Sequence, residues 1–482
     1  MNRAIRNTAI FALLMSLVLL VNLSVVQVFK DKDYAKNDLN RRGLYEMKSV
    51  PRGQISAGGQ VLAQSVKGAD DFYVRQYPND VQPYGATLGY LSDVYGASGI
   101  ESSYNGVLSG TDPSLFAARW WDTLSGKEKS GASVKLTLEP AVQQAAYEGL
   151  TSRGYQGSVV AIRPKTGEIL AMASTPSYDP ALIADPNTAE DTWAALQNQE
   201  GAPMLNHASQ ETLPPGSTFK VITTAAGLES GYTADSSVTG ARQITLPNTN
   251  TTLENYGGQS CGGSSTTLRQ AFAKSCNTAF VEMGINVGDQ ALSKAAENFG
   301  VDDNYDLGVP MTQGTIGDLS DAAARGQSSI GQRDVSLSVL QNAVVAATVA
   351  NGGKRMEPHL VSEILGSDLK SLKKTKAKEL NEAVSPEIAK TLTELMRGSE
   401  KMTSGYTGAD IASKTGTAEH GEDSRNSNPH AWYIAFGPSQ DADVAVAVVV
   451  KNGGNRGQAA TGGSVAAPIG REVIDAALRN AR

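Results

Sequence analysis

Leu213-Pro214-Pro215-Gly216-Ser217-Thr218-Phe219-Lys220 lies near the middle of the chain and places a hydroxyl and an amine three residues apart. The Pro-Pro-Gly turn that precedes them cannot continue a helix backwards, so a helix is expected to begin near Ser217. Positions i and i+3 of a helix share a face. The stretch therefore predicts that the side chains of Ser217 and Lys220 meet.

Such a pair has the parts of an activated nucleophile. A serine hydroxyl needs an adjacent base, and Lys220 is a base only when it is neutral, a form that burial or a second cation favours. The backbone N–H of Ser217, without a partner at a helix start, suits an oxyanion. An isolated Ser-x-x-Lys is more often a helix cap with a solvated lysine. Here the lysine stands between Phe219 and the apolar pair Val221-Ile222, which favours burial.

A second polar cluster, Ser275-Cys276-Asn277, begins 58 residues after Ser217. It follows a helix-like segment, residues 267–273, and is expected to form a loop between helices. Ser275 is a candidate to relay a proton between Lys220 and a leaving amine, and Asn277 to hold the amide of an acyl donor. The cluster also fits a simple cap for the next helix, and both roles are compatible.

A third cluster, Lys414-Thr415-Gly416-Thr417, begins 139 residues after Ser275 and is expected to form a strand. Gly416 allows a peptide-like ligand to approach the strand edge. Lys414 and Thr415 suit a carboxylate, and the backbone N–H of Thr417 suits a second oxyanion contact. The alternative is an edge strand with a solubilising lysine.

In this order, the three motifs resemble those of the class B penicillin-binding proteins, which are monofunctional peptidoglycan transpeptidases. Within that family, the chain most resembles the actinobacterial penicillin-binding protein A type. The resemblance covers essentially the whole chain. Further matches are residues 52–55, 99–101, 108–110 and 331–332. The chain departs from the family at Ser56-Ala57-Gly58-Gly59, where relatives often have a different turn.

The resemblance implies a catalytic set of Ser217 as the acylated nucleophile, Lys220 as its base, and Ser275, Asn277 and Lys414 in the cleft. It further implies substrate binding by the whole strand motif. The implied activity is a D,D-transpeptidase that cross-links peptidoglycan stem peptides ending in D-Ala-D-Ala during growth or division and is inhibited by β-lactams. Neither a metal nor an organic cofactor is expected, because hydroxyls, amines and N–H groups supply the chemistry.

Three other functions share these motifs. A β-lactamase needs fast deacylation, and a long N-terminal part with an anchor fits it poorly. A D,D-carboxypeptidase differs only in using water as the acceptor, so the sequence leaves it open. A penicillin-binding scaffold or sensor would be acylated without turnover. The resemblance also implies a membrane glycan polymerase of the shape, elongation and division type as a partner.

Composition sets further limits. The chain has 482 residues and is 40% apolar, enough for two or three domains with a large core. Its net charge of −7 argues against nucleic acid as a partner. The four histidines are scattered and no Cys/His group has zinc spacing. The pair Cys261 and Cys276 is expected in an exported protein either as a disulfide near the site or as two thiols.

The N-terminus predicts a membrane anchor. Arg3 and Arg6 precede residues 8–29, which carry no charge and as a helix extend about 33 Å, enough to cross a bilayer. Positive charge before the span predicts a cytoplasmic start and a catalytic part on the extracytoplasmic side. A cleaved signal peptide is the alternative.

The rest of the chain is expected to form an α+β fold in two units. Residues 30–145 are predicted to form a smaller pedestal, or dimerisation-like, domain, and residues 146–482 the penicillin-binding transpeptidase domain. In the second unit, the sequence predicts strands at both ends and helices between them, hence an antiparallel sheet covered by helices. The expected strands are residues 158–162, 168–174, 431–436 and 444–450, and the expected helices 335–350, 386–397 and 465–480.

Overall fold

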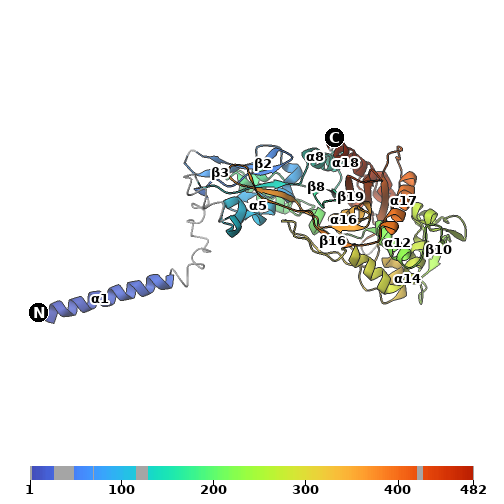
Figure 1. The fold of residues 1–482 in the computed structure, drawn as a ribbon, viewed down its shortest axis with the longest axis horizontal. Helices are drawn as coiled ribbons and strands as arrows, with labels where there is room; N and C mark the ends of the chain where they lie inside the picture. The colour runs from blue at the N-terminus through green and yellow to red at the C-terminus, as the bar shows by residue number, and fades with distance from the viewer. Residues whose placement is uncertain (1–2, 27–47, 69, 116–128, 421–426, 481–482) are drawn as a thin grey trace.

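The structure is a computed structural model, and it describes residues 3–26, 48–68, 70–115, 129–420 and 427–480. Figure 1 shows helix α1 (Arg3–Ser24) apart from a body with a sheet at each end. This helix is long and apolar enough to span a membrane, with a mean hydropathy of 2.1, and none of its residues is buried. It begins before the predicted span, and positions 27–29 of that span lie outside the described residues.

The sheet of the N-terminal half has six strands in the order β15-β14-β6-β1-β2-β3. Their bounds are β1 Ile55–Ala57, β2 Gln60–Lys67, β3 Tyr73–Gln76, β6 Ser133–Leu136, β14 Val361–Leu365 and β15 Ser371–Lys374. Strand β6 pairs parallel with β1 and antiparallel with β14. The sheet thus contains two strands from residues that the sequence placed in the second unit, so the boundary near residue 145 stays a prediction.

A buried charge cluster holds this half together. The carboxylate of Glu101 is fully buried and accepts hydrogen bonds from Arg52 Nε at 2.9 Å and Arg75 Nε at 2.6 Å. Arg75 also donates to the carbonyl of Gly53 at 2.8 Å. Because Arg52 and Glu101 belong to the segments that resemble the family, the structure gives those motifs a packing role.

The second sheet has five strands in the order β17-β18-β19-β7-β8, with all neighbours antiparallel. The bounds are β7 Gly157–Ile162, β8 Ile169–Thr175, β17 Ala412–Ala418, β18 His430–Gly437 and β19 Val444–Val450. The predicted strands are confirmed to within one residue at each end. Strand β19 is a continuous run of Val and Ala because both of its faces are buried.

Helices cover both faces of this sheet. Helices α8 (Pro140–Thr151) and α18 (Ala467–Asn480) pack on one face with Tyr433, and α16 (Val339–Ala350) packs on the other with Trp432. The predicted start of α16 at residue 335 is wrong. Ser338 forms a capping box with Gln341, so the helix begins only at Val339.

The remaining elements surround these layers. Other helices are α4 Gly85–Leu88, α5 Gly99–Ser103, α6 Asn105–Ser109, α9 Pro180–Ala184, α10 Ala189–Asn198, α11 His207–Gln210, α12 Lys220–Glu229, α13 Leu268–Ala273, α14 Asn277–Asn298, α15 Ala322–Ser328 and α17 Pro386–Met402. Short strands are β4 Leu91–Ser92, β5 Gly96–Ala97, β9 Ser237–Thr239, β10 Gln243–Thr245, β11 Thr252–Glu254, β12 Ser265–Thr267, β13 Lys354–Met356 and β16 Glu379–Glu382.

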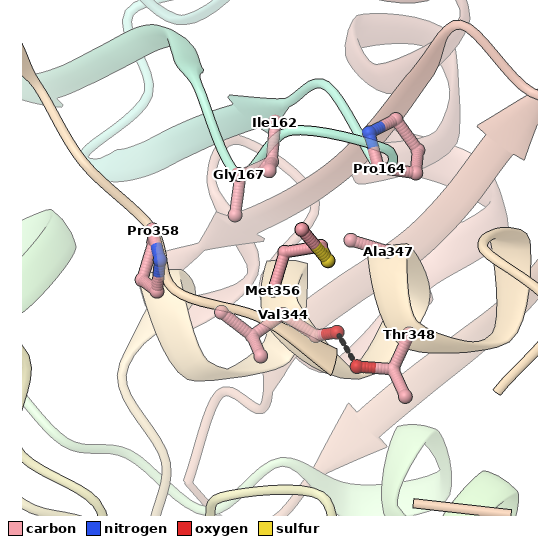
Figure 2. Close-up of a pocket in the computed structure, with 8 residues that line it drawn as sticks. All are labelled: Ile162, Pro164, Gly167, Val344, Ala347, Thr348, Met356 and Pro358. Atoms are coloured by element: carbon pink, nitrogen blue, oxygen red, sulfur yellow. Dashed lines mark hydrogen bonds between the residues drawn. The ribbon is translucent and has the colours of Figure 1, made fainter. Parts of the chain in front are cut away.

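A small pocket marks where the turn between β7 and β8 meets α16 and the chain that leaves β13 (Figure 2). The hydroxyl of Thr348 in its wall donates to the carbonyl of Val344 at 2.8 Å, so that hydroxyl is already paired. A Cβ on Gly167 would come within 2.2 Å of the Glu357 carbonyl oxygen. None of the three sequence motifs lines this pocket. It is a close packing junction between the chain segments that lead to the two sheets.

Replacing Glu101 by Gln should lower the free energy of unfolding by about 3–5 kcal/mol, because two buried guanidinium groups lose their counter-charge. Urea unfolding measures this loss. The matched control is Glu472→Gln, which breaks an exposed ion pair with Arg153 and should cost less than about 1 kcal/mol. Equal losses in the two variants would contradict the structural role given to Glu101.

Candidate active site

The Ser217 motif forms a 3₁₀ turn, Gly216–Phe219, that leads directly into α12. Residues i and i+3 lie almost above one another in a 3₁₀ helix, so Ser217 and Lys220 are expected to project on the same side. Among the described residues, the Lys220 amine bonds to Ser275 and Asn277 and makes no hydrogen bond to Ser217, so the predicted meeting of Ser217 and Lys220 stays a prediction. Ser217 is half-buried and Lys220 is fully buried. The lysine is therefore not the solvated side chain of an ordinary helix start.

Close backbone contacts fix the turn before Ser217. Gly216 has a left-handed φ of 53°, and its N–H donates to the carbonyl of Gly331 at 2.9 Å. A Cβ on Gly331 would lie 2.2 Å from the Gly216 carbonyl oxygen. The indole N–H of Trp432 donates to the carbonyl of Pro214 at 2.8 Å. The match to the family at Gly331 thus corresponds to a position that only glycine fits.

The second motif surrounds the amine of Lys220. Its Nζ lies 2.8 Å from the Ser275 carbonyl oxygen, 2.7 Å from Asn277 Oδ1 and 3.3 Å from Ser275 Oγ. Ser275 has a φ of 58°, a left-handed conformation that is uncommon for residues other than glycine. In this conformation, both oxygens of Ser275 face the lysine.

The third motif meets the same hydroxyl. Lys414 Nζ donates to Ser275 Oγ at 2.8 Å and to the carbonyl of Thr415 at 3.0 Å. The hydroxyl of Ser275 therefore lies between two lysine amines that come from α12 and β17. The structure brings together the side chains of Lys220, Ser275, Asn277 and Lys414 as the sequence predicts.

Both amines are fully buried, and an aromatic ring lies near each of them. Lys220 Nζ lies 5.4 Å from the ring centre of Phe280, and Lys414 Nζ lies 5.8 Å from that of Phe272. Burial, and then the charge of Lys414, lower the pKa of Lys220 well below its ordinary value. Burial alone lowers the pKa of Lys414 to about 7. A neutral Lys220 beside a protonated Lys414 is thus accessible near neutral pH.

Strand β17 is the edge strand of the five-stranded sheet and carries the rest of the third motif. Thr415 and Thr417 are half-buried on one face, opposite Lys414. A Cβ on Gly216 would lie 2.7 Å from the Thr417 carbonyl oxygen, so the Ser217 turn lies against the end of this strand. An edge strand beside a nucleophile can pair with an extended peptide.

Gly462 is a residue of this site that the sequence analysis missed. A Cβ there would lie 2.0 Å from the Trp432 carbonyl oxygen and 2.7 Å from that of Gly416. It begins a π-helical turn, Gly462–Ala466, just before α18, where the sequence predicted only an ordinary helix from residue 465. The Gly-Gly pair ahead of that helix is the signal that points to close backbone packing.

A second feature that the sequence analysis missed involves Ser413, which lies on the face of β17 opposite Lys414. Glu400, from α17, accepts hydrogen bonds from Ser413 Oγ at 2.5 Å, the Tyr433 hydroxyl at 2.9 Å and Arg471 Nε at 2.8 Å. These buried bonds tie the strand that carries Lys414 to α17 and α18. No sequence pattern points to them, because the four residues are far apart in the chain.

The structure joins Cys261 and Cys276 in a disulfide, which is one of the two alternatives left open by the sequence. Cys276 lies between Ser275 and Asn277, so the bond ties the second motif to the loop before β12. Within the described residues, no group of three or more His, Cys, Asp or Glu side chains is placed to hold a metal ion.

The penicillin-binding protein transpeptidase domain matches residues 157–475, and the penicillin-binding protein A dimerisation domain matches residues 52–134. The chain is 48% identical to the peptidoglycan D,D-transpeptidase PbpA of Mycolicibacterium smegmatis, with 99% of each chain covered. The chain belongs to the class B penicillin-binding proteins of the PbpA type.

Solved structures agree with this assignment. Penicillin-binding protein A from M. tuberculosis, as its penicillin G acyl-enzyme complex, superposes with a TM-score of 0.85 at 47% identity, covering 89% of this chain and all of that one. Its ceftriaxone acyl-enzyme complex gives a TM-score of 0.86 at 46% identity, covering 90% of this chain and 99% of that one. The predicted family, fold and transpeptidase activity are therefore confirmed, whereas the roles of single residues stay predictions.

Replacing Gly462 by Ala should slow acylation by up to about 100-fold, because the new methyl group pushes β17 out of place beside the nucleophile. It should also destabilise the fold by about 1–3 kcal/mol through overpacking. Stopped-flow acylation and urea unfolding measure the two effects. The control Gly398→Ala adds a methyl group with its nearest neighbour 4.0 Å away and should leave acylation unchanged.

The second-order rate constant of acylation is expected to follow a bell-shaped pH profile, which reports the groups of the free enzyme. On the acidic side, the rate constant should rise with pH as Lys220 loses its proton and becomes able to act as a base. The falling limb should centre near the pKa of about 7 of Lys414, because only protonated Lys414 attracts a carboxylate. A rate constant that keeps rising well above neutral pH would contradict this assignment.

Proposed function

We propose that this protein is a peptidoglycan D,D-transpeptidase that acts through an acyl-enzyme on Ser217, with donor stem peptides ending in D-Ala-D-Ala. One observation supports this most strongly. Three motifs that are far apart in the chain converge on the hydroxyl of Ser275, which lies between the buried amines of Lys220 and Lys414. A buried amine with a lowered pKa is what an unactivated serine needs as its base.

The donor stem binds along the exposed edge of β17. Its terminal carboxylate lies near Lys414 and Thr415, where a cation and a hydroxyl are available. Gly416 leaves room for the peptide backbone, as an added strand requires. The penultimate carbonyl carbon then lies beside Ser217. The backbone N–H groups of Ser217 and Thr417 bind the developing oxyanion.

In the acylation step, the Ser217 oxygen attacks the penultimate D-alanine carbonyl and its proton passes to neutral Lys220. The C–N bond to the last D-alanine breaks, and that amine leaves with the proton, which the hydroxyl of Ser275 relays from Lys220. Lys414 stays protonated and holds Ser275 in place, while Asn277 binds an amide of the donor. In the second step, the amine of a neighbouring stem attacks the ester, its proton returns to Ser217, and a cross-link forms.

β-Lactams follow the first step only. Their strained amide resembles the donor, so Ser217 opens the ring and becomes acylated. The two acyl-enzyme structures of M. tuberculosis penicillin-binding protein A support this expectation for the present chain.

The remaining proposals concern the cellular setting. Helix α1 anchors the chain in the cell membrane as a single span, with the positive charges of Arg3 and Arg6 on the cytoplasmic side and the catalytic part outside. A membrane glycan polymerase of the shape, elongation and division type supplies the strands to be cross-linked. Residues 30–145 serve as a pedestal for residues 146–482.

Ser217→Ala should abolish covalent labelling by fluorescent penicillin, and Lys220→Ala should slow it by at least about 100-fold because the hydroxyl loses its base. Intact mass with a β-lactam and peptide mapping locate the adduct. Lys451→Ala, which removes an amine outside the site that pairs with Glu211, is the control and should label normally. Normal labelling of Lys220→Ala would overturn the mechanism.

Incubation with D-Ala-D-Ala stem peptides and an amine acceptor tests the acceptor. We expect a cross-linked product that carries the acceptor amine and an equal amount of free D-alanine. Release of D-alanine with no cross-linked product would identify a carboxypeptidase, and acylation without any turnover would identify a scaffold.

A further inference from the structure

The segment Gly366–Lys378 is the most basic stretch of an otherwise acidic chain. It holds five lysines and one aspartate, whereas the whole chain has a net charge of −7. The segment includes the turn after β14, the edge strand β15 and the residues that follow it. Every residue from 367 to 378 is exposed. We call this segment the basic hairpin.

The basic hairpin also exposes large apolar side chains at its tip. Leu369, in a left-handed conformation at the turn, is 60% exposed, and Leu372 is 41% exposed. Lys370 pairs only locally, with Asp368 at 3.1 Å, and its side chain is 83% exposed. Lysines alone would fit the guarding of an edge strand against pairing with other chains. Exposed leucines among them do not serve that purpose.

The position of the basic hairpin in the fold points to a partner. The chain arriving from α1 joins the body at residues 48–51, and the carbonyl of Pro51 accepts a hydrogen bond from Gly131 at 2.9 Å. Gly131 lines a cavity together with residues 366–368 and 370–372, and Ser133 pairs with Leu365. The hairpin tip is therefore at the end of the body where the anchor is attached.

We propose that the basic hairpin docks the body onto the anionic lipid surface of the membrane that holds α1. Lysine ammonium groups attract anionic headgroups, and apolar side chains beside them insert at the boundary between headgroups and acyl chains. The chain between Ser24 and Lys48 limits the separation of anchor and body to about 80 Å. This tether keeps the hairpin at a high effective concentration near the bilayer, so a weak affinity for the lipid surface is sufficient for docking.

Docking would restrict how the catalytic sheet is presented to the cell wall. The basic hairpin and the Ser217 site belong to different sheets, which Figure 1 shows at opposite ends of the body. With the hairpin on the bilayer, the edge strand β17 is held away from the membrane. The proposal concerns a surface outside the active site, so it can fail without affecting the proposed catalysis.

The test uses the full chain in lipid nanodiscs, with an environment-sensitive fluorophore on Leu369→Cys. The two native cysteines are paired with each other and are not expected to react. In discs that contain phosphatidylglycerol, we expect a blue-shifted and brighter emission than in neutral phosphatidylcholine discs. High salt should reverse the change, because it screens the attraction.

Charge reversal provides the matched comparison. Adding Lys373→Glu and Lys374→Glu should reduce the fluorescence difference between the two lipids at least two-fold. Adding Lys390→Glu and Lys401→Glu, on exposed positions of α17 at the other end of the body, changes the net charge equally and should leave it intact. Unchanged labelling of every variant by fluorescent penicillin verifies that each is folded.

Three outcomes would overturn the proposal. One is the same emission in both lipids. Another is an equal effect of the α17 and hairpin reversals, which would mean that only net charge matters. The third is the same blue shift when poly-glutamate is added to neutral discs, which would assign the hairpin to an acidic polymer or protein and not to the lipid surface.

Discussion

Two fully buried lysine amines share one serine hydroxyl, and the segments around them pack closely to maintain this arrangement. Burying an amine disfavours its charge, and burying two of them near each other does so more strongly. Burial of the two amines, and the charge of Lys414 beside Lys220, lower their pKa values. The lowered pKa of Lys220 is the property that its proposed role as a base at neutral pH requires.

In this site, main-chain segments from different parts of the chain lie in direct contact with one another. The turn before Ser217 is in contact with Gly331 behind it and with the end of β17 beside it, and Gly462 lies against the backbones of Gly416 and Trp432. Any side chain at these glycines would separate the nucleophile from the substrate strand. The disulfide at Cys276 and the left-handed backbone of Ser275 serve the same end, because they direct the oxygens of the second motif towards Lys220. Close packing of main chain therefore fixes the turn before Ser217 against strand β17.

The other half of the molecule has a different physical character. Its sheet is built from two segments that are far apart in the chain, residues 55–136 and 361–374. Its core contains a carboxylate between two guanidinium groups, which holds the family-like segments around Arg52 and Glu101 together. Strands β14 and β15 extend from the catalytic part into this sheet, so the two halves are joined by pairing and not only by a linker. The charged core and the basic hairpin belong to this half, whereas the residues proposed for acyl transfer belong to the other.

Elements with local signals could be predicted from the amino-acid sequence. Continuous apolar runs predicted strands β7, β8, β18 and β19, the uncharged N-terminal run predicted α1, and the motif order predicted the family and the residues that meet around Lys220. Tertiary structure alone decided what depends on contacts between distant segments: the joining of β14 and β15 to the N-terminal sheet, the bonds of Glu400 to β17 and the close approach at Gly462. The tendency to form a helix or strand depends on residues that are neighbours in the chain. Strand order, the burial of an amine and the resulting shift of its pKa arise only when remote segments pack together.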